Sequence, residues 1–184
     1  FLYLLSDSRV QIDDNGEFCQ IKPAKMRIEF IGDSITSGEG LAGAPEQMEW
    51  IPSVFVGSES YAAQVSRYFG AEFSVFSQCG WGLCWGWDGN RNNNMPSFYE
   101  KVCGVMEGDF HNQLGENQDY DFKDGSDFVV LNLGTNDNGA FFQPPWKDEK
   151  TGVEYKLELE KGKISAADKE YIVQAAKSFL SLIR

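Results

Sequence analysis

Short apolar runs that fit β-strands recur along most of this chain, and a segment with helical periodicity separates the first two of them. RIEFIG (27–32), AEFSVFS (71–77) and DFVVLNLG (127–134) are short and rich in β-branched and aromatic residues, as strands are. SYAAQVSRYFG (60–70) carries apolar residues four positions apart and ends on a glycine, which is typical of a capped helix. This alternation predicts an α/β domain, a parallel sheet covered by helices in three layers.

The last twenty residues, SAADKEYIVQAAKSFLSLIR, predict a longer helix that starts at a capping box formed by Ser165 and Asp168. Its expected buried stripe consists of Ile172, Val173, Ala176, Phe179, Leu180 and Ile183. The 127–134 strand is apolar enough to be buried on both faces. We expect the 27–32 strand to lie between the other two, which is the flavodoxin-like strand order. No strand follows the last helix, so the sheet is expected to be incomplete and to need a further C-terminal segment.

The N-terminal residues have a different pattern. Two short strands are expected around Asp14-Asn15-Gly16, a strong hairpin signal, and Lys22-Pro23-Ala24 is a plausible junction. We therefore divide the chain into 1–24, the end of a preceding domain, and 25–184, the α/β domain. FLYLLSDSRV at the start has neither a basic leader nor a small-residue cleavage site, so no signal peptide is expected.

Composition excludes several partners. The formal net charge is -12 and the sequence pI is near 4.5, so a nucleic acid would be repelled. No apolar run reaches the roughly 18 residues of a membrane span. The acidic 107–127 stretch lacks the pattern of a calcium loop, and no nucleotide-binding glycine motif is present. No metal, cofactor, nucleic acid or membrane is expected; a neutral polymer such as a polysaccharide stays open.

Residues that could perform acyl transfer follow the three strands. In open parallel sheets, ligands bind beyond the carboxyl ends of the strands. Ser34 follows the first strand, Gly80 the second and Asn136 the third. A serine oxygen can attack a carbonyl carbon, while the N–H groups of Ser34 and Gly80 and the Asn136 amide can hold the oxyanion. The sequence therefore predicts a serine nucleophile with an oxyanion hole.

Structural alternatives exist for each of these residues. Ser34 could simply cap a helix, and Gly82 competes with Gly80. Asp33 could be a general base, but a role in holding the turn is favoured. Asp137 could contact a substrate, but binding of backbone groups at the strand end is favoured.

The motifs GDSITSG and LGTND resemble the first and third conserved blocks of the SGNH hydrolases, also called GDSL-like esterases. The longer stretches RIEFIGDSITSGEG, SYAAQVSRYFGAEF, NMPSFYEKV and FVVLNLGTND resemble the family 2 carbohydrate esterases, which are acetylxylan esterases. The resemblance covers about residues 25–184. Each block alone is a modest signal, but four blocks in order are specific.

The resemblance implies Ser34 as the nucleophile, with Gly80 and Asn136 completing the oxyanion hole. It implies a histidine base in a late Asp-x-x-His block, and some family members use a Ser-His pair without a triad carboxylate. It also implies a β-sandwich domain before the catalytic domain, with residues 1–24 as its last strands, and secretion or a cell-surface location. The only histidine, His111, lies in a polar excursion. We expect it to be an ordinary surface residue and the base to lie outside this chain.

Aromatic and cysteine side chains crowd the segment after the second strand. Trp81 and Trp85 are the tryptophans selected as substrate-binding residues, because sugar rings pack on flat indoles; packing in the core is the favoured alternative. Trp87 and, more weakly, Trp146 could join the same wall. Cys79 and Cys84 could approach each other, although free thiols packed as small hydrophobic groups are favoured.

Together these features predict a metal-free serine esterase that removes O-acetyl groups from an acetylated polysaccharide or oligosaccharide. A lipid or aryl esterase of the same fold is one alternative. A non-catalytic carbohydrate-binding protein on a decayed esterase scaffold is the other.

Overall fold

A parallel three-stranded sheet organises the computed structural model, which describes residues 22–47, 49, 51–106, 108–122 and 125–183. The sheet consists of β1 (Arg27–Gly32), β2 (Glu72–Ser77) and β3 (Phe128–Asn132) in the order β2-β1-β3. The predicted parallel sheet and its order are confirmed. The hairpin expected in residues 1–21 lies outside the described residues, as do residues 1–21 of the domain remnant expected in residues 1–24.

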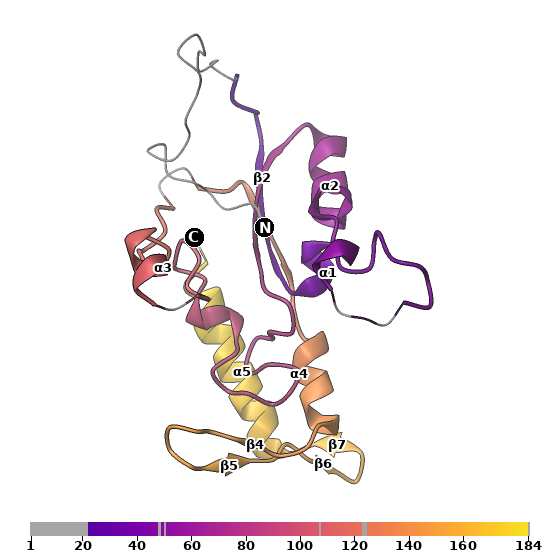
Figure 1. Ribbon diagram of the computed structural model, residues 1–184, viewed down its shortest axis with the longest axis vertical. Helices are drawn as coiled ribbons and strands as arrows, with labels where there is room; N and C mark the ends of the chain where they lie inside the picture. The colour runs from indigo at the N-terminus through magenta and orange to yellow at the C-terminus, as the bar shows by residue number, and fades with distance from the viewer. Residues whose placement is uncertain (1–21, 48, 50, 107, 123–124, 184) are drawn as a thin grey trace.

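Helices lie on both faces of this sheet, as predicted (Figure 1). Figure 1 shows α1 and α2 on one side, and α3 and α5 on the other. Two small antiparallel hairpins, β4–β5 and β6–β7, lie together at one end of the molecule. The remaining bounds are α1 (Ser34–Ser37), α2 (Tyr61–Phe69), α3 (Asp109–Gln113), α4 (Thr135–Gly139), β4 (Trp146–Lys147), β5 (Glu154–Tyr155), β6 (Leu159–Glu160), β7 (Lys163–Ile164) and α5 (Ala166–Leu180), with 3₁₀ turns at Pro52–Val54, Gly57–Glu59, Met95–Ser97 and Ala140–Phe142.

The long helices begin and end where their capping residues predict. The Ser165 hydroxyl accepts a hydrogen bond from the Asp168 N–H at 3.0 Å and donates to the Asp168 carboxylate at 2.7 Å, so the capping box before α5 is confirmed. Gly70 ends α2 in the left-handed conformation, with φ +61°. No helix in the described part of the chain is long and apolar enough to cross a bilayer.

Side chains that alternate along β1 enter separate apolar clusters. Ile28 and Phe30 pack with Ala62 of α2 on one face. Ile31 points to the other face, where Phe179 of α5 belongs to the same buried cluster. The central strand is therefore covered on both sides, which holds the residues that follow it in a fixed position.

Two predictions of burial are wrong in part. β3 was expected to be buried on both faces, but Phe128, Val130 and Leu131 are exposed, because β3 is an edge strand that pairs only with β1 among the described residues. On α5, Val173 and Leu180 are exposed, whereas Phe179 is buried. The exposed residues are apolar, so these surfaces are candidates for contact with more polypeptide.

A buried carboxyl group on β1 makes stability depend on pH. Glu29 is 3% exposed and accepts a hydrogen bond of 2.6 Å from the Tyr99 hydroxyl. Burial raises the pKa of Glu29 above the ordinary 4.5, and the bond from Tyr99 opposes this only in part. The folded protein therefore holds the proton more tightly than the unfolded chain. This contribution to stability is complete below pH 4.5 and is lost as pH rises through the folded-state pKa.

We therefore expect Glu29→Gln to raise the melting temperature at pH 7 more than at pH 4, because the ionised carboxylate that it removes is buried. Glu72→Gln on the neighbouring strand is the control with the opposite sign. The pKa of Glu72 is lowered by the Ala24 N–H and by Arg27, so this change removes a favourable carboxylate. Thermal unfolding at both pH values measures the effect. A Glu29→Gln variant that is less stable at pH 7 would contradict this account.

Candidate active site

The register of the sheet brings three strand ends together. Gly32, the last residue of β1, pairs with Ser77 of β2 on one side and with Asn132 of β3 on the other. Neighbouring strands in a sheet are about 4.8 Å apart. The segments that leave the three strands therefore start side by side at the carboxyl edge of the sheet.

Asp33 and Ser34 turn the chain from β1 directly into α1. Asp33 is 2% exposed, and its Oδ1 accepts a hydrogen bond of 3.0 Å from the Ile35 N–H, so it caps the helix. The favoured structural role of Asp33 is confirmed. The alternative that Ser34 is the cap is wrong, because Ser34 is the first residue of the helix itself.

The side chain of Ser34 has no structural task that the described residues show. It is half-buried, and neither its hydroxyl nor its N–H bonds to a described residue. Burial raises the pKa of the adjacent Asp33 carboxyl, the Ile35 N–H lowers it, and the negative charges of Glu39 and Asp137 raise it further. Ser34 is therefore a hydroxyl and a backbone N–H without internal partners, beside a buried acid.

Gly80 and Gly82 differ in what their N–H groups do. The Gly82 N–H donates to the Trp85 carbonyl at 3.0 Å, whereas none of the described residues accepts from the Gly80 N–H. Gly80 has φ +75°, and a Cβ there would lie 2.8 Å from Cδ1 of Trp87. Both features favour glycine. Of the two glycines, Gly80 has the N–H that can hold an anion.

Asn136 connects all three strand ends. Its Nδ2 donates to the Trp81 carbonyl at 2.9 Å and to Oδ2 of Asp33 at 3.3 Å. Asp33 follows β1, Trp81 lies in the segment after β2, and Asn136 lies in α4 after β3. The carboxamide therefore reaches the turn that carries Ser34 and the segment that carries Gly80.

Asp137, the next residue, holds the segment after β2. It is 7% exposed, and its carboxylate accepts hydrogen bonds from the Leu83 N–H at 2.8 Å and the Cys84 N–H at 2.7 Å. A Cβ on Gly82 would collide with this carboxyl group, so glycine permits the close approach. The favoured role of Asp137, the binding of backbone groups, is confirmed.

Asp137→Ala should lower the free energy of unfolding by about 2–6 kcal/mol, because a backbone N–H that loses its acceptor costs about 1–3 kcal/mol and this change affects two. Asn138→Ala replaces an exposed side chain of the same helix and is the matched control. Urea unfolding of the protein that contains this chain measures both. If the two variants are equally stable, the carboxylate does not hold the segment.

The tryptophans of this region do not all lie where the sequence analysis expected. Trp85 is 0% exposed, stacks on Tyr171 and donates from Nε1 to the Asp137 carbonyl. The expectation that it binds substrate is therefore corrected, because its indole belongs to the core. Trp81 is half-buried and packs edge-on against Phe98. Trp87 is 53% exposed and lies beside Gly80.

Trp87 is not one of the two tryptophans predicted to bind substrate, although it was expected to be able to join the same aromatic wall. Two local signals could have separated it from Trp85. Trp87 comes directly before Asp88-Gly89, a turn dipeptide, which favours the surface. Trp85 instead follows the apolar pair Leu83-Cys84, which is typical of a segment that enters the core.

The His111 side chain pairs with a glutamate outside the candidate active site. It lies in α3, and its Nδ1 is 2.8 Å from Oε2 of Glu116, which is 5% exposed. Figure 1 shows α3 and α1 on opposite sides of the sheet, so His111 is remote from Ser34. The expectation of a solvated histidine needs correction, since the ring is half-buried and paired, but His111 is not placed to act as the base.

The described cysteines are free thiols, in line with the favoured alternative. Burial raises the pKa of Cys79 to about 11, and burial together with the nearby Asp137 raises that of Cys84 to about 12. Neither group is a thiolate near neutral pH, so neither is an activated nucleophile there.

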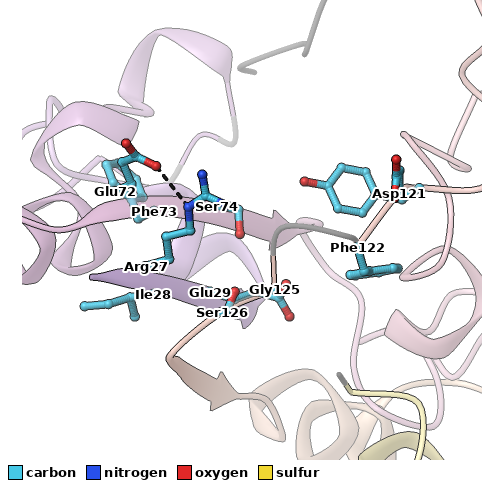
Figure 2. Close-up of a pocket in the computed structure, with 11 residues that line it drawn as sticks. Arg27, Ile28, Glu29, Glu72, Phe73, Ser74, Asp121, Phe122, Gly125 and Ser126 are labelled. Carbon is cyan, nitrogen blue, oxygen red and sulfur yellow. Dashed lines mark hydrogen bonds and ion pairs between the residues drawn. The ribbon is translucent and has the colours of Figure 1, made fainter. Parts of the chain in front are cut away.

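A pocket of about 180 Å³ lies at the other end of the sheet (Figure 2). Its lining includes Arg27 and Glu72, the first residues of β1 and β2, which form an ion pair of 3.1 Å. This is the amino edge of the strands, where ligands of open parallel sheets do not usually bind. The pocket is therefore separate from the candidate active site.

Comparisons with known proteins found similarity to carbohydrate esterases. An acetyl xylan esterase, Est2A from the rumen bacterium Butyrivibrio proteoclasticus, is 40% identical with a TM-score of 0.87 over 92% of this chain and 46% of its own. A family two carbohydrate esterase from Clostridium thermocellum, solved with cellohexaose, is 25% identical with a TM-score of 0.63 over 91% of this chain and 41% of its own. No protein-family profile matches the chain.

A curated relative points the same way. Cellulase/esterase CelE of Acetivibrio thermocellus is 31% identical over 123 residues, which are 66% of this chain and 14% of that protein. The chain thus spans less than half of each of these proteins. The structural neighbours are family 2 carbohydrate esterases, so the resemblance predicted from the sequence is confirmed, and the three-stranded sheet is consistent with part of an SGNH-like domain.

Proposed function

We propose that this chain supplies the nucleophile and the oxyanion hole of a serine esterase that removes acetyl groups from a carbohydrate. The observation that carries the proposal is the Asn136 carboxamide, which bonds to the turn before Ser34 and to the segment after Gly80. The similarity to an acetyl xylan esterase supports the substrate class.

In the proposed reaction, the Ser34 oxygen attacks the acetyl carbonyl carbon and gives its proton to a base. The carbonyl oxygen becomes an anion that accepts hydrogen bonds from the N–H groups of Ser34 and Gly80 and from Nδ2 of Asn136. The bond from Nδ2 to Asp33 is the longer of its two, so this N–H is the one that turns to the oxyanion. The sugar leaves with the proton as an alcohol, and water releases acetate from the acetyl-serine.

The base is proposed to be a histidine outside residues 1–184, because the one histidine of this chain is paired with Glu116. Without a base, a serine hydroxyl is a poor nucleophile near neutral pH. The domain division at residue 24 and a secreted or cell-surface location stay part of the proposal. Detection of the protein in the culture medium of its source tests the location.

The exposed indole of Trp87 is the proposed sugar-binding surface. It lies beside Gly80, so a sugar stacked on it would bring its acetyl group to the oxyanion hole. Trp81, which is half-buried, stays part of the proposed sugar-binding surface.

Acetate release by the full-length protein tests this function. We expect acetylated xylo-oligosaccharides to be deacetylated with a higher kcat/KM than p-nitrophenyl esters of long-chain acids. A preference for the long-chain esters would identify a lipid or aryl esterase instead. Binding of the oligosaccharide without any release of acetate would identify a non-catalytic binding protein.

A further segment is proposed to complete the sheet and the active site. Phe128, Val130 and Leu131 on the edge strand β3 are apolar and exposed, and such edges pair with other polypeptide. Residues 1–184 alone are therefore expected to aggregate in size-exclusion chromatography with light scattering, whereas a longer protein that contains them runs as one species. A 184-residue monomer that melts cooperatively would contradict this prediction.

A further inference from the structure

Arg91 lies over two aromatic rings. Its guanidinium carbon is 4.3 Å from the ring centroid of Tyr155 and 5.7 Å from that of Tyr171. Trp146 stacks on Tyr155, with centroids 5.7 Å apart and planes at 23°. We call Arg91, Trp146, Tyr155 and Tyr171 the Arg91 cluster. It joins the segment after β2 to the β4–β5 hairpin and to α5.

The guanidinium in this cluster has donors without acceptors. Ring faces attract its charge but leave the N–H groups at its edge without an oxygen to bind. Among the described residues, none forms an ion pair with the Arg91 side chain or accepts a hydrogen bond from it. The side chain is half-buried, so the rings limit its movement. A planar guanidinium offers a fork of N–H groups that matches the two oxygens of a carboxylate.

The backbone ties Arg91 closely to the proposed oxyanion hole. The Gly80 carbonyl accepts a hydrogen bond of 2.8 Å from the Trp87 N–H. Gly86, next to Trp87, donates at 2.9 Å to the carbonyl of Asn90, the residue before Arg91. The exposed indole of Trp87 therefore lies between Gly80 and Arg91 along this folded segment.

The hydrophobic core connects the Arg91 cluster to the candidate active site by a second route. Tyr171 stacks on Trp85 with planes at 7°, and Nε1 of Trp85 donates to the Asp137 carbonyl at 3.0 Å. Asp137 follows Asn136. Figure 1 shows the β4–β5 hairpin and α4 at the same end of the molecule. The Arg91 cluster is thus packed into the same unit as the candidate active site.

We propose that Arg91 binds the carboxylate of a uronic acid carried by the acetylated polysaccharide. This inference rests on the proposed function, since it names the class of carbohydrate that the same site accepts. The chain has a net charge of -12, so an acidic sugar would be repelled over most of its surface. The Arg91 guanidinium, which has no anionic partner among the described residues, compensates for that repulsion at one place.

Binding to the full-length protein with Ser34→Ala tests this, because the variant prevents turnover. Calorimetry compares a xylo-oligosaccharide that carries one uronic acid with the unsubstituted oligosaccharide of equal length. We expect the acidic ligand to bind about tenfold tighter, the effect of a charge-assisted hydrogen bond. Adding Arg91→Gln should reduce this ratio to one or below, because the acidic surface then repels the uronic acid. Arg91→Lys keeps the charge but not the fork and should give a ratio between those of Arg91→Gln and the parent.

Arg67→Gln is the matched control, because Arg67 is an exposed arginine of α2 that pairs with Glu59 at 3.2 Å. It should keep the ratio of the parent protein. Melting temperatures show whether each variant is folded. If Arg91→Gln does not fold, the binding ratio of Arg91→Lys decides the test. Equal binding of the two ligands by the parent, or an unchanged ratio in the Arg91 variants, overturns this inference alone. Binding of neither ligand counts against the carbohydrate substrate and overturns both.

Discussion

Ser34→Ala is expected to lower kcat for acetate release by about 10⁴-fold or more in the full-length protein, because in the proposed mechanism the acetyl-enzyme forms on the Ser34 oxygen. The cysteines nearby cannot replace it, since burial raises the pKa of Cys79 to about 11 and, together with Asp137, that of Cys84 to about 12. The Ser34 side chain bonds to no described residue, so its loss should leave the melting temperature almost unchanged.

This combination of lost activity and kept stability is the informative result. Ser37→Ala is a suitable control, because Ser37 lies in the same helix and its hydroxyl bonds to Ser77 at 2.7 Å. It should cost some stability but little activity. Release of p-nitrophenol from p-nitrophenyl acetate measures both variants. Unchanged turnover in Ser34→Ala would falsify the proposed mechanism.

Asn136→Ala has the second largest expected effect, a loss of about 10²–10³-fold in kcat, the usual cost of one oxyanion-hole donor. KM should change little, because the donor strengthens its bond only when the carbonyl oxygen becomes an anion. The variant also removes the bond to the Trp81 carbonyl, so some loss of stability is expected.

Two comparisons separate these effects. Asn138→Ala, an exposed change on the same helix, should keep full activity. Asp137→Ala should lose stability first, because its carboxylate holds the Leu83 and Cys84 N–H groups. If Asn136→Ala and Asp137→Ala lose kcat only in proportion to their loss of folded protein, Asn136 is a structural residue and not an oxyanion donor.

The parts of the fold that repeat a simple pattern could be predicted. The strand 27–32 has the expected limits, and the order of the three strands is the flavodoxin-like order expected for this alternation of strands and helices. Gly70 and the Ser165 capping box mark helix ends through local chemistry that tertiary packing did not override. The meeting of the Asp33 turn, the Trp81 segment and Asn136 also follows from this order.

Other parts depend on packing that a linear pattern does not contain. The β4–β5 and β6–β7 hairpins have two-residue strands, too short to show alternation. Trp85 and Trp87 are two residues apart in one polar segment, yet one packs under α5 and the other reaches solvent. Asp137, which is distant in the sequence, binds the Leu83 and Cys84 N–H groups and accepts a hydrogen bond from the Trp85 indole, and the local sequence shows none of these contacts.

The central position of β1 has a consequence for how such proteins diverge. Because β1 already has a neighbour on each side, a strand added to the sheet pairs with β2 or β3 and leaves the carboxyl ends of β1, β2 and β3 side by side. The proposed oxyanion hole and the proposed base could then change independently in evolution. A protein that lost the base would still bind the ester carbonyl, so a deacetylating enzyme would become a protein that only binds the acetylated sugar.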